Sequence, residues 1–321
     1  MISLLRRQHS APGASRPYRT FLSIPLRVAA AGAVLAGAAT LLGAQDSGAG
    51  STPAARGMVL VELFTSEGCP HCPDADAMLE RMYSTQPVDG VEIVPVEEHV
   101  DYWDRAEWVD HFSSPSFTER QKKYADAMEL ESIYTPQMVV DGVVEFAGNN
   151  ESRARATISA LRLALGPTLS FSPANPRAVP AAAAMKAQVQ LQGKELTLGG
   201  PANVYLILTE DKLTSRVGGG SNAGESWKHS SVARWFYRVG QLRAEEKNFS
   251  AGLALADPDP GWRLENLRLI ALVQEEESRK VVAVGLARWQ EVVGARGPSA
   301  PSGAVSPAAP ATSKSPGLPR R

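Results

Sequence analysis

The stretch "ELFTSEGCPHCPDAD", residues 62–76, contains both cysteines of this 321-residue chain, Cys69 and Cys72. A CxxC pair can exchange electrons, hold a metal ion or close a short loop. A disulfide between cysteines this close in sequence removes little freedom from the unfolded chain. We therefore do not expect the pair to serve stability alone.

The residues around the cysteines predict a strand followed by a helix. "MVLVELF", residues 58–64, is almost continuously apolar and rich in strand formers, and Gly68 ends it. Helical spacing then follows at Ala75, Met78, Leu79 and Met82, so Cys69 should stand at or just before the first turn of a helix. A second strand is predicted at 91–96, which puts the CxxC at a strand–helix junction, where open α/β sheets place their chemistry.

The next segments complete a predicted α/β domain over residues 57–166. Residues 101–130 are polar and compatible with a helix, and 133–148 indicate a hairpin turning at Asp141-Gly142. Residues 150–165 form an amphipathic pattern capped near Asn150. The predicted order is strand, helix, strand, helix, hairpin, helix.

Beyond residue 166 the composition changes. Residues 167–185 are rich in Pro and Ala and predict a linker, and 186–294 contain short apolar runs typical of a mostly antiparallel β-sandwich domain. Residues 295–321 predict a disordered tail. The expected fold is an α/β domain with inserted helices followed by this sandwich.

The N-terminus predicts export. Residues 1–44 carry five arginines and no acid, then an apolar run ending in small residues, which is the order of a signal peptide; 45–56 follow as a short linker. Without those arginines the formal charge falls from −1 to −6, which leaves no basic surface for nucleic acid. We expect a location outside the cytoplasm, in the bacterial periplasm, with an uncleaved N-terminal membrane anchor as the alternative.

The cysteine pair suits thiol–disulfide exchange. A thiol at a helix N-terminus faces unpaired N–H groups that stabilise a thiolate, so we assign Cys69 as the nucleophile and Cys72 as its resolving partner. His71 adds positive charge or a hydrogen bond, which favours the oxidase direction. Asp74 and Asp76 oppose it because their charges destabilise a neighbouring thiolate.

Two features resemble thioredoxin-like proteins. The strand "VLVELF" followed by CPHC and a helix is similar to their active-site start, and Pro70-His71 matches the dipeptide of periplasmic disulfide oxidases. Thr135-Pro136, at the start of the predicted hairpin, matches the thioredoxin cis-proline. That resemblance implies that Pro136 aligns the substrate backbone and that Thr135 contacts substrate.

A closer resemblance covers most of the mature chain. "HVDYWDRAEWVDHFSSPSFTERQKKYADAM", "YTPQMVVDG" and "SNAGESWKHSSVARW" resemble an exported bacterial thioredoxin-like family of unknown function, of the DUF1223 type. Small residues such as Ser would be expected between the cysteines, where this chain has Pro70-His71. The implied activity is thiol–disulfide exchange with exported proteins and with a redox partner, without a diffusible cofactor.

Several other residues are candidates for the same site. Glu62 lies on the first strand, close to where thioredoxins carry a buried acid, and could relay a proton to the resolving thiol; its alternative is a solvent-facing position. His99, Asp101 and Trp103 follow the second strand and are candidates for substrate binding or for holding the inserted helix. We expect surface or structural roles for His111 and His229.

Two other functions remain open. Cys69 and Cys72 with His71 or His99 could hold Cu(I) or Zn(II) in a metal carrier, although the remaining ligands have no convincing spacing, so no metal site is assigned. Alternatively, the chain is a binding module in which the β domain recognises the partner. The glycine-rich stretch 217–229 indicates a long hairpin loop.

Overall fold

The computed structural model describes residues 57–161, 167–173, 187–255 and 257–293. The predicted signal peptide (1–44), short linker (45–56) and tail (295–321) lie outside these residues, as does most of the predicted linker. Among the described helices, none combines the length and the apolar character that crossing a membrane requires.

The first part of the chain follows the predicted order of elements. Its strands and helices are β1 (Gly57–Thr65), α1 (Pro73–Thr85), β2 (Val91–His99), α2 (Pro115–Ala127), β3 (Gln137–Val140), β4 (Val144–Ala147) and α3 (Glu151–Leu161). β1 pairs in parallel with β2 and antiparallel with β3. The β3–β4 turn uses Asp141 and Gly142 with positive φ angles of 46° and 68°, which confirms the predicted hairpin turn.

Strands from the second part of the chain extend the same sheet. β7 (Ala202–Glu210), β10 (Val232–Leu242), β12 (Leu267–Glu275) and β13 (Val281–Arg288) join β1–β4 in one eight-stranded sheet of order β13-β12-β7-β10-β2-β1-β3-β4. The two parts meet where Val232 of β10 pairs in parallel with Glu97 of β2.

The prediction of a separate sandwich domain was therefore wrong. The described residues belong to one compact unit, and apolar side chains of both parts share one buried cluster, which includes Leu60, Val94, Ile207 and Ile270. The physical reason is that β2 would otherwise be an edge strand with unpaired backbone groups, and β10 pairs with that edge at Glu97.

A smaller sheet packs on the extension. Its strands are β5 (Ser170–Pro173), β6 (Ala187–Gly193) and β11 (Phe249–Leu255), so β5 lies within the range predicted as linker. Leu169 and Leu191 pack in one buried cluster with Leu208 and Leu269 of the large sheet, beside the short helix α4 (Trp289–Val293). Sandwich-like packing therefore exists here, but the first part of the chain shares one of its layers.

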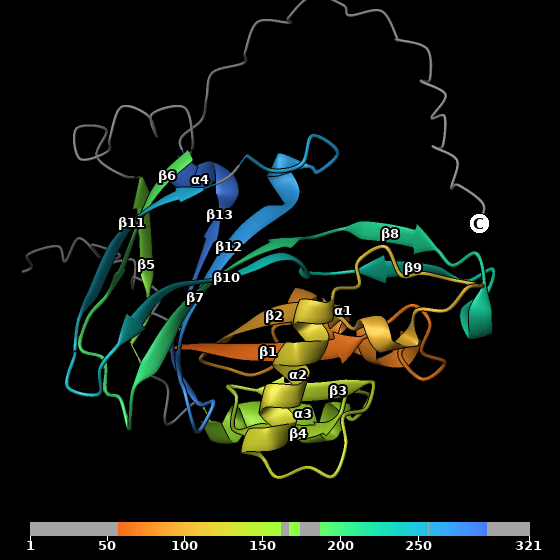
Figure 1. Ribbon diagram of the computed structural model, residues 1–321, viewed down its shortest axis with the longest axis horizontal. Coiled ribbons are helices and arrows are strands. Elements are labelled where there is room, and N and C mark those ends of the chain that lie inside the picture. Colours follow the sequence, from red (N-terminus) through yellow and green to blue (C-terminus); the bar gives the residue numbers. More distant parts are fainter. Residues whose placement is uncertain (1–56, 162–166, 174–186, 256, 294–321) are drawn as a thin grey trace, which may run out of the picture. The chain divides into compact units, whose positions relative to one another are not determined.

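A two-stranded hairpin completes the fold. β8 (Leu213–Arg216) and β9 (Ser226–His229) are joined through the short 3₁₀ helix η5 (Gly220–Asn222), and two more such turns are η1 (Asp101–Trp103) and η6 (Leu264–Asn266). The hairpin extends beyond the large sheet in Figure 1. Its second strand contacts α1.

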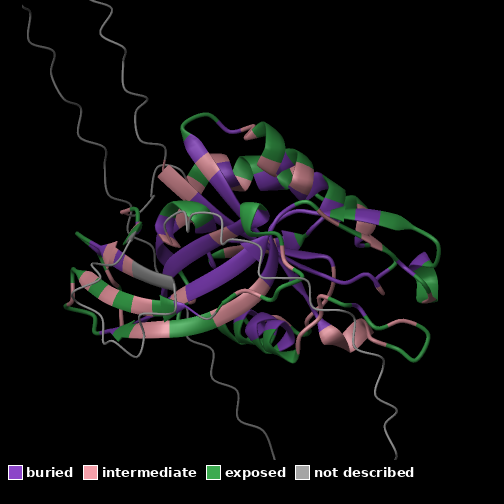
Figure 2. Ribbon diagram, turned by 90° about the horizontal axis from the view of Figure 1, so that it is seen from above, coloured by how far each residue is buried: buried purple, intermediate pink, exposed green. Residues whose placement is uncertain are grey.

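The first strand explains where the chemistry lies. Val59, Val61 and Leu63 alternate with Leu60 and pack against α1 and α3 on one face of the sheet. Figure 2 shows the central strands as buried and the outer sides of the helices as exposed. β1 and β2 are parallel, so their carboxyl ends meet at one edge of the sheet, and residues 65–69 and 99–103 follow there.

Candidate functional site: a covered disulfide beside a buried polar cluster

Cys69 and Cys72 form a disulfide at the start of α1. Their Cα atoms lie 5.5 Å apart, within the usual range for a disulfide. Pro73 begins the helix, Cys72 is its N-cap residue, and the N–H of Cys69 donates to the carbonyl of Ser66. Cys69 thus lies just before the helix, as expected, and Cys72 lies at its border.

Side chains from three segments cover the disulfide. Both cysteines are completely buried and share an apolar cluster with Trp103, Trp108, Val217 and Trp227. The last two of these belong to the β8–β9 hairpin and its loop, so the hairpin lies over the disulfide. A partner cannot reach either sulfur atom while this cover is in place.

The tip of the hairpin is fixed by one amide. Asn222 donates two hydrogen bonds from Nδ2, to the carbonyl oxygens of Glu67 and Cys69, each 2.9 Å long. Gly219 lies so close to the carbonyl of Glu107 that a Cβ atom would overlap it. The predicted glycine-rich loop is therefore a close-fitting cover over residues 67–69.

The Thr-Pro pair lies on the same side of the molecule. The peptide bond between Thr135 and Pro136 is cis, as the sequence predicted. Trp103, which packs against the apolar cluster around the disulfide, donates from Nε1 to the hydroxyl of Thr135 at 2.6 Å. Trp103, Thr135 and Pro136 are thereby brought together, and His71 is exposed.

Glu62 is placed differently from its predicted role. It is completely buried, but its carboxylate accepts hydrogen bonds from Arg120 Nε at 2.6 Å and from the hydroxyl of Tyr124, both on α2. β1 alternates between its two faces, so Glu62 points toward α2 while its neighbours Val61 and Leu63 face α1. A proton relay from Glu62 to Cys72 does not fit this arrangement.

Asp101 also has a structural partner. Its backbone N–H donates to the hydroxyl of Thr118, which in turn donates to Oδ1 of Asp101. These bonds tie η1 to α2. Asp101 therefore holds the inserted helix in place, which is the alternative to substrate binding that the sequence left open.

His99 faces a second polar cluster rather than the rim of the disulfide. Its ring is fully buried, and its Nδ1 atom lies 2.7 Å from Oδ2 of Asp110. One ligand atom each from Asp76, Glu97, His99 and His229 lie within 4.8 Å of one another, and all four residues are buried. We expected a surface or structural role for His229, and the structure places it in this buried cluster.

Burial and charge shift the ionisation of the cluster. Burial raises the pKa of Asp76 to about 7, and the charge of Glu97 adds to this. For His99, burial lowers the pKa, but the nearby charge of Asp110 outweighs it and the pKa lies well above its usual value. The pKa of His229 is likewise raised to about 9, because the nearby carboxylates of Glu67 and Glu97 outweigh its burial. The protonation of each of these side chains therefore depends on the charges of its neighbours in the cluster.

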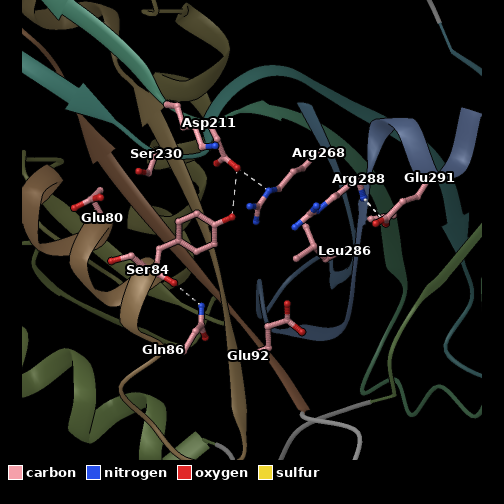
Figure 3. A pocket seen from close by; sticks show the side chains of 13 residues that line it. Glu80, Ser84, Gln86, Glu92, Asp211, Ser230, Arg268, Leu286, Arg288 and Glu291 are labelled. Atoms are coloured by element: carbon pink, nitrogen blue, oxygen red, sulfur yellow. Dashed lines mark hydrogen bonds and ion pairs between the residues drawn. The ribbon is translucent and has the colours of Figure 1, made fainter. Parts of the chain in front are cut away.

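Two cavities open near these elements. The smaller, of about 310 Å³, lies between α1 and β9 and is lined in part by Asp76 and Trp227. The larger, of about 690 Å³, is shown in Figure 3; there Asp211 faces Arg268, with their Oδ2 and Nε atoms 2.7 Å apart. No predicted site residue lines either cavity, but the smaller one is bordered by Asp76 of the polar cluster and by Trp227, which covers the disulfide, so it is the opening closer to the site.

A protein family matches the region that contains the cysteine pair and the hairpin. Residues 60–274 match DUF1223, a family described as proteins of unknown function. The chain belongs to the DUF1223 family. The match spans both the cysteine pair and the β8–β9 hairpin, so the cover belongs to the family region of this DUF1223 protein.

One named protein is similar to this chain in sequence, and two solved structures are similar to it in fold. A thioredoxin of Methanocaldococcus jannaschii is 34% identical over 90 residues, which are 28% of the DUF1223 chain and 79% of the thioredoxin. The predicted DUF1223-type, thioredoxin-like family is thus confirmed. A crystal structure of an Agrobacterium tumefaciens protein is similar in fold, with 23% identity, a TM-score of 0.56 and coverage of 73% of this chain and 95% of that one. HBP35 of Porphyromonas gingivalis matches with 13% identity, a TM-score of 0.53 and coverage of 78% and 80%.

The sequence reasoning missed residues that lie far from the cysteines in the chain. Asn222 and Trp227 were within a loop that was recognised only by its glycines. His229 follows that loop by a few residues, and Glu97 is two residues before His99 on β2. Successive side chains of a strand point to opposite faces, so Glu97 and His99, which are two residues apart, lie on one face of β2. This alternation was the available sequence signal for the cluster.

Proposed function

We propose that this DUF1223 protein catalyses thiol–disulfide exchange on exported proteins through Cys69 and Cys72. The observation that carries the proposal is the disulfide at the start of α1, with Trp103 connecting it to the cis Thr135-Pro136 pair. We further propose that residues 57–161 act as a thioredoxin-like unit and that the later strands extend it.

The exchange proceeds in two balanced steps. A client thiolate attacks Sγ of Cys69, the bond between the cysteines breaks, and Cys72 leaves as a thiolate that takes up a proton. A second client thiolate then attacks the client sulfur of the mixed disulfide, and Cys69 leaves. The client gains one disulfide, and the protein gains the two electrons as a dithiol.

The chain's own residues have distinct parts in this scheme. The exposed imidazole of His71 lies between the cysteines and can stabilise the thiolate of Cys69. Pro136 aligns the backbone of the client chain, and Thr135 contacts it. No diffusible cofactor is needed, and a separate redox partner must remove the two electrons after each turnover.

The cover makes opening a required step. Cys69 and Cys72 have no exposed surface, so the β8–β9 hairpin must move before a client thiolate can approach Sγ. Such gating keeps small thiols away from the disulfide until a client or partner displaces the hairpin. The recognition of clients is thereby assigned to the hairpin and to the surface near Thr135.

The location follows from the N-terminal sequence. We propose that residues 1–44 direct export to the periplasm, where disulfides persist, with an uncleaved membrane anchor as the alternative. Clients are then exported proteins with free thiols or disulfides. Nucleic acid is not among the proposed partners.

A client assay tests the proposal. The protein is added to a reduced, unfolded protein that needs disulfides for its activity, and the recovery of that activity is followed. We expect oxidation above the buffer rate for the wild type and loss of turnover for Cys69→Ser. Cys72→Ser, incubated with the disulfide-bonded form of the same client, should accumulate a mixed disulfide, because Cys69 attacks one client sulfur and the other client sulfur leaves as a thiol. A folded wild type that neither accelerates oxidation or reduction of the client nor traps it would overturn the proposal.

A further inference from the structure

The buried polar cluster has the composition of a metal site without cysteine. Asp76 lies on α1, Glu97 and His99 lie on β2, and His229 ends β9. Their ligand atoms lie within 4.8 Å of one another, and each residue is nearly or fully excluded from solvent. Two imidazoles and two carboxylates from three elements therefore converge on one point.

Each of the four side chains is held by one atom only. Asp76 Oδ2 accepts from the hydroxyl of Thr65 at 2.8 Å, and Glu97 Oε1 accepts from the N–H of Ser230 at 3.1 Å. The other two are the imidazoles. His99 Nδ1 lies 2.7 Å from Asp110, and the Nε2 atom of His229 lies 2.9 Å from the hydroxyl of Ser215.

The second atom of each side chain has no hydrogen-bond partner among the described residues. These atoms are Asp76 Oδ1, Glu97 Oε2, His99 Nε2 and His229 Nδ1. Buried polar atoms are nearly always paired, so four unpaired atoms in one place indicate a ligand. A carboxylate on the far nitrogen of an imidazole, as Asp110 provides for His99, is the arrangement that orients metal-binding histidines.

Ion pairing within the cluster explains the arrangement less well. Glu97 Oε2 lies 3.4 Å from His229 Nδ1 and 3.8 Å from His99 Nε2, and neither contact forms a hydrogen bond. Asp76 adds a second buried carboxylate to the group, and no ion pair or hydrogen bond among the described residues engages its Oδ1 atom. Two ligands bound at about 2.0–2.1 Å in tetrahedral geometry lie about 3.4 Å apart. The two separations from Glu97 Oε2 are close to that value, and no two ligand atoms of the set are more than 4.8 Å apart.

We propose that Asp76, Glu97, His99 and His229 bind one zinc(II) ion. Two neutral imidazoles and two carboxylates form a four-coordinate nitrogen and oxygen site, a donor set that suits zinc, and the two carboxylates balance its charge. The cavity of about 310 Å³ that reaches Asp76 between α1 and β9 gives the ion a path of entry. This site is distinct from a carrier site on Cys69 and Cys72, because it uses neither cysteine.

The site also links the cover to the sheet. His229 belongs to the hairpin that places Trp227 over the disulfide, whereas Glu97 and His99 belong to β2. An ion bound by all four residues fixes β9 against β2 and α1. Binding to the folded state alone stabilises that state, so zinc must raise the melting temperature.

Metal content and thermal melting test the site directly. The purified protein is treated with EDTA, dialysed, incubated with zinc chloride and passed over a desalting column, and its zinc is measured by mass spectrometry. We expect one zinc per chain and a higher melting temperature. His229→Ala and Glu97→Gln should lose the bound zinc, and His71→Ala, an exposed histidine, should keep it.

Two further variants distinguish this site from zinc held by the cysteines and from misfolding of a ligand variant. Asp110→Asn leaves all four ligands in place and should weaken zinc binding by about 10- to 100-fold, so it tests the site even if a ligand variant does not fold. The double variant Cys69→Ser, Cys72→Ser should retain one zinc. It also removes thiol exchange, so a failure of the metal site and a failure of the proposed function give different results.

Three outcomes would overturn the site. One is a folded wild type that retains no zinc after desalting. Another is zinc that disappears in the double cysteine variant and persists in His229→Ala, since that places the metal on the thiols. The third comes from a parallel incubation with manganese(II) chloride: retention of one equivalent of manganese by a protein that retains no zinc contradicts the assignment of the ion.

Discussion

Replacement of Asn222 by alanine should open the cover over the disulfide. The Asn222 amide donates two hydrogen bonds of 2.9 Å, one to the carbonyl of Glu67 and one to that of Cys69. No cysteine and no residue of the polar cluster is changed. The variant therefore tests the cover alone.

The structure allows an estimate of the effect. Each of the two hydrogen bonds contributes about 0.5–1.5 kcal/mol net, which gives about 1–3 kcal/mol for the pair. If that free energy is lost from the closed state, the population of the open state rises by about 5- to 150-fold. The rate at which a reductant reaches the disulfide rises by the same factor when opening and closing are fast.

Reduction of the disulfide by a phosphine under native conditions measures this rate. Asn203→Ala is the matched control, because Asn203 is as buried as Asn222 and accepts from Arg238 at the start of β7, whereas the hairpin follows the other end of that strand. Urea unfolding of both variants separates local opening from global loss of stability. Equal reduction rates for Asn222→Ala and wild type, or equal acceleration in Asn203→Ala, would refute the cover.

Three further changes have expected outcomes. Burial raises the pKa of Asp141 from 3.8 to about 7, so the folded state holds a proton that the unfolded state releases, and stability falls as the pH rises from about 4 to 7. Asp141→Asn keeps an acceptor for the N–H of Leu60, so urea unfolding should show a gain of up to about 4 kcal/mol at pH 8 and almost none at pH 4; an equal gain at both values contradicts this. Arg120→Met leaves two buried glutamates of β1 and β2 without their cation and should cost about 3–5 kcal/mol in the same assay, whereas a neutral result means that the pairing is dispensable. Gly219→Ala should speed reduction of the disulfide by the phosphine, because the new Cβ atom overlaps the carbonyl of Glu107 and displaces the hairpin loop. Gly200→Ala, whose Cβ atom would enter open space, should not change that rate.

The local elements of the first part were predictable because neighbouring residues specify them. A continuous apolar run gave β1, helical spacing gave α1, and Asp141-Gly142 gave the hairpin turn. The cis peptide at Pro136 followed from the resemblance to thioredoxin-like proteins. In each case the information lay within a short stretch of the chain.

The longer-range features depended on contacts that no short stretch encodes. β10, "VARWFYRVGQL", was not predicted as a strand, since polar and aromatic residues interrupt its pattern, yet it joins the two parts of the sheet. Glu62 is buried, close to where thioredoxins carry an acid, but its side chain pairs with Arg120, which lies 58 residues later in the sequence. His99 and His229 meet only because β10 pairs with β2, which also brings the hairpin over the cysteines.

Equilibration of the protein with glutathione buffers tests thiol–disulfide exchange by Cys69 and Cys72 most directly. The fraction of reduced protein is measured by mass spectrometry after thiol alkylation, with Cys69→Ser as the control. A redox-active pair should show one two-electron transition with a midpoint between about −270 and −120 mV, the range of exchange enzymes. A pair that stays oxidised below about −300 mV would be a structural disulfide, and this result would contradict the proposed function.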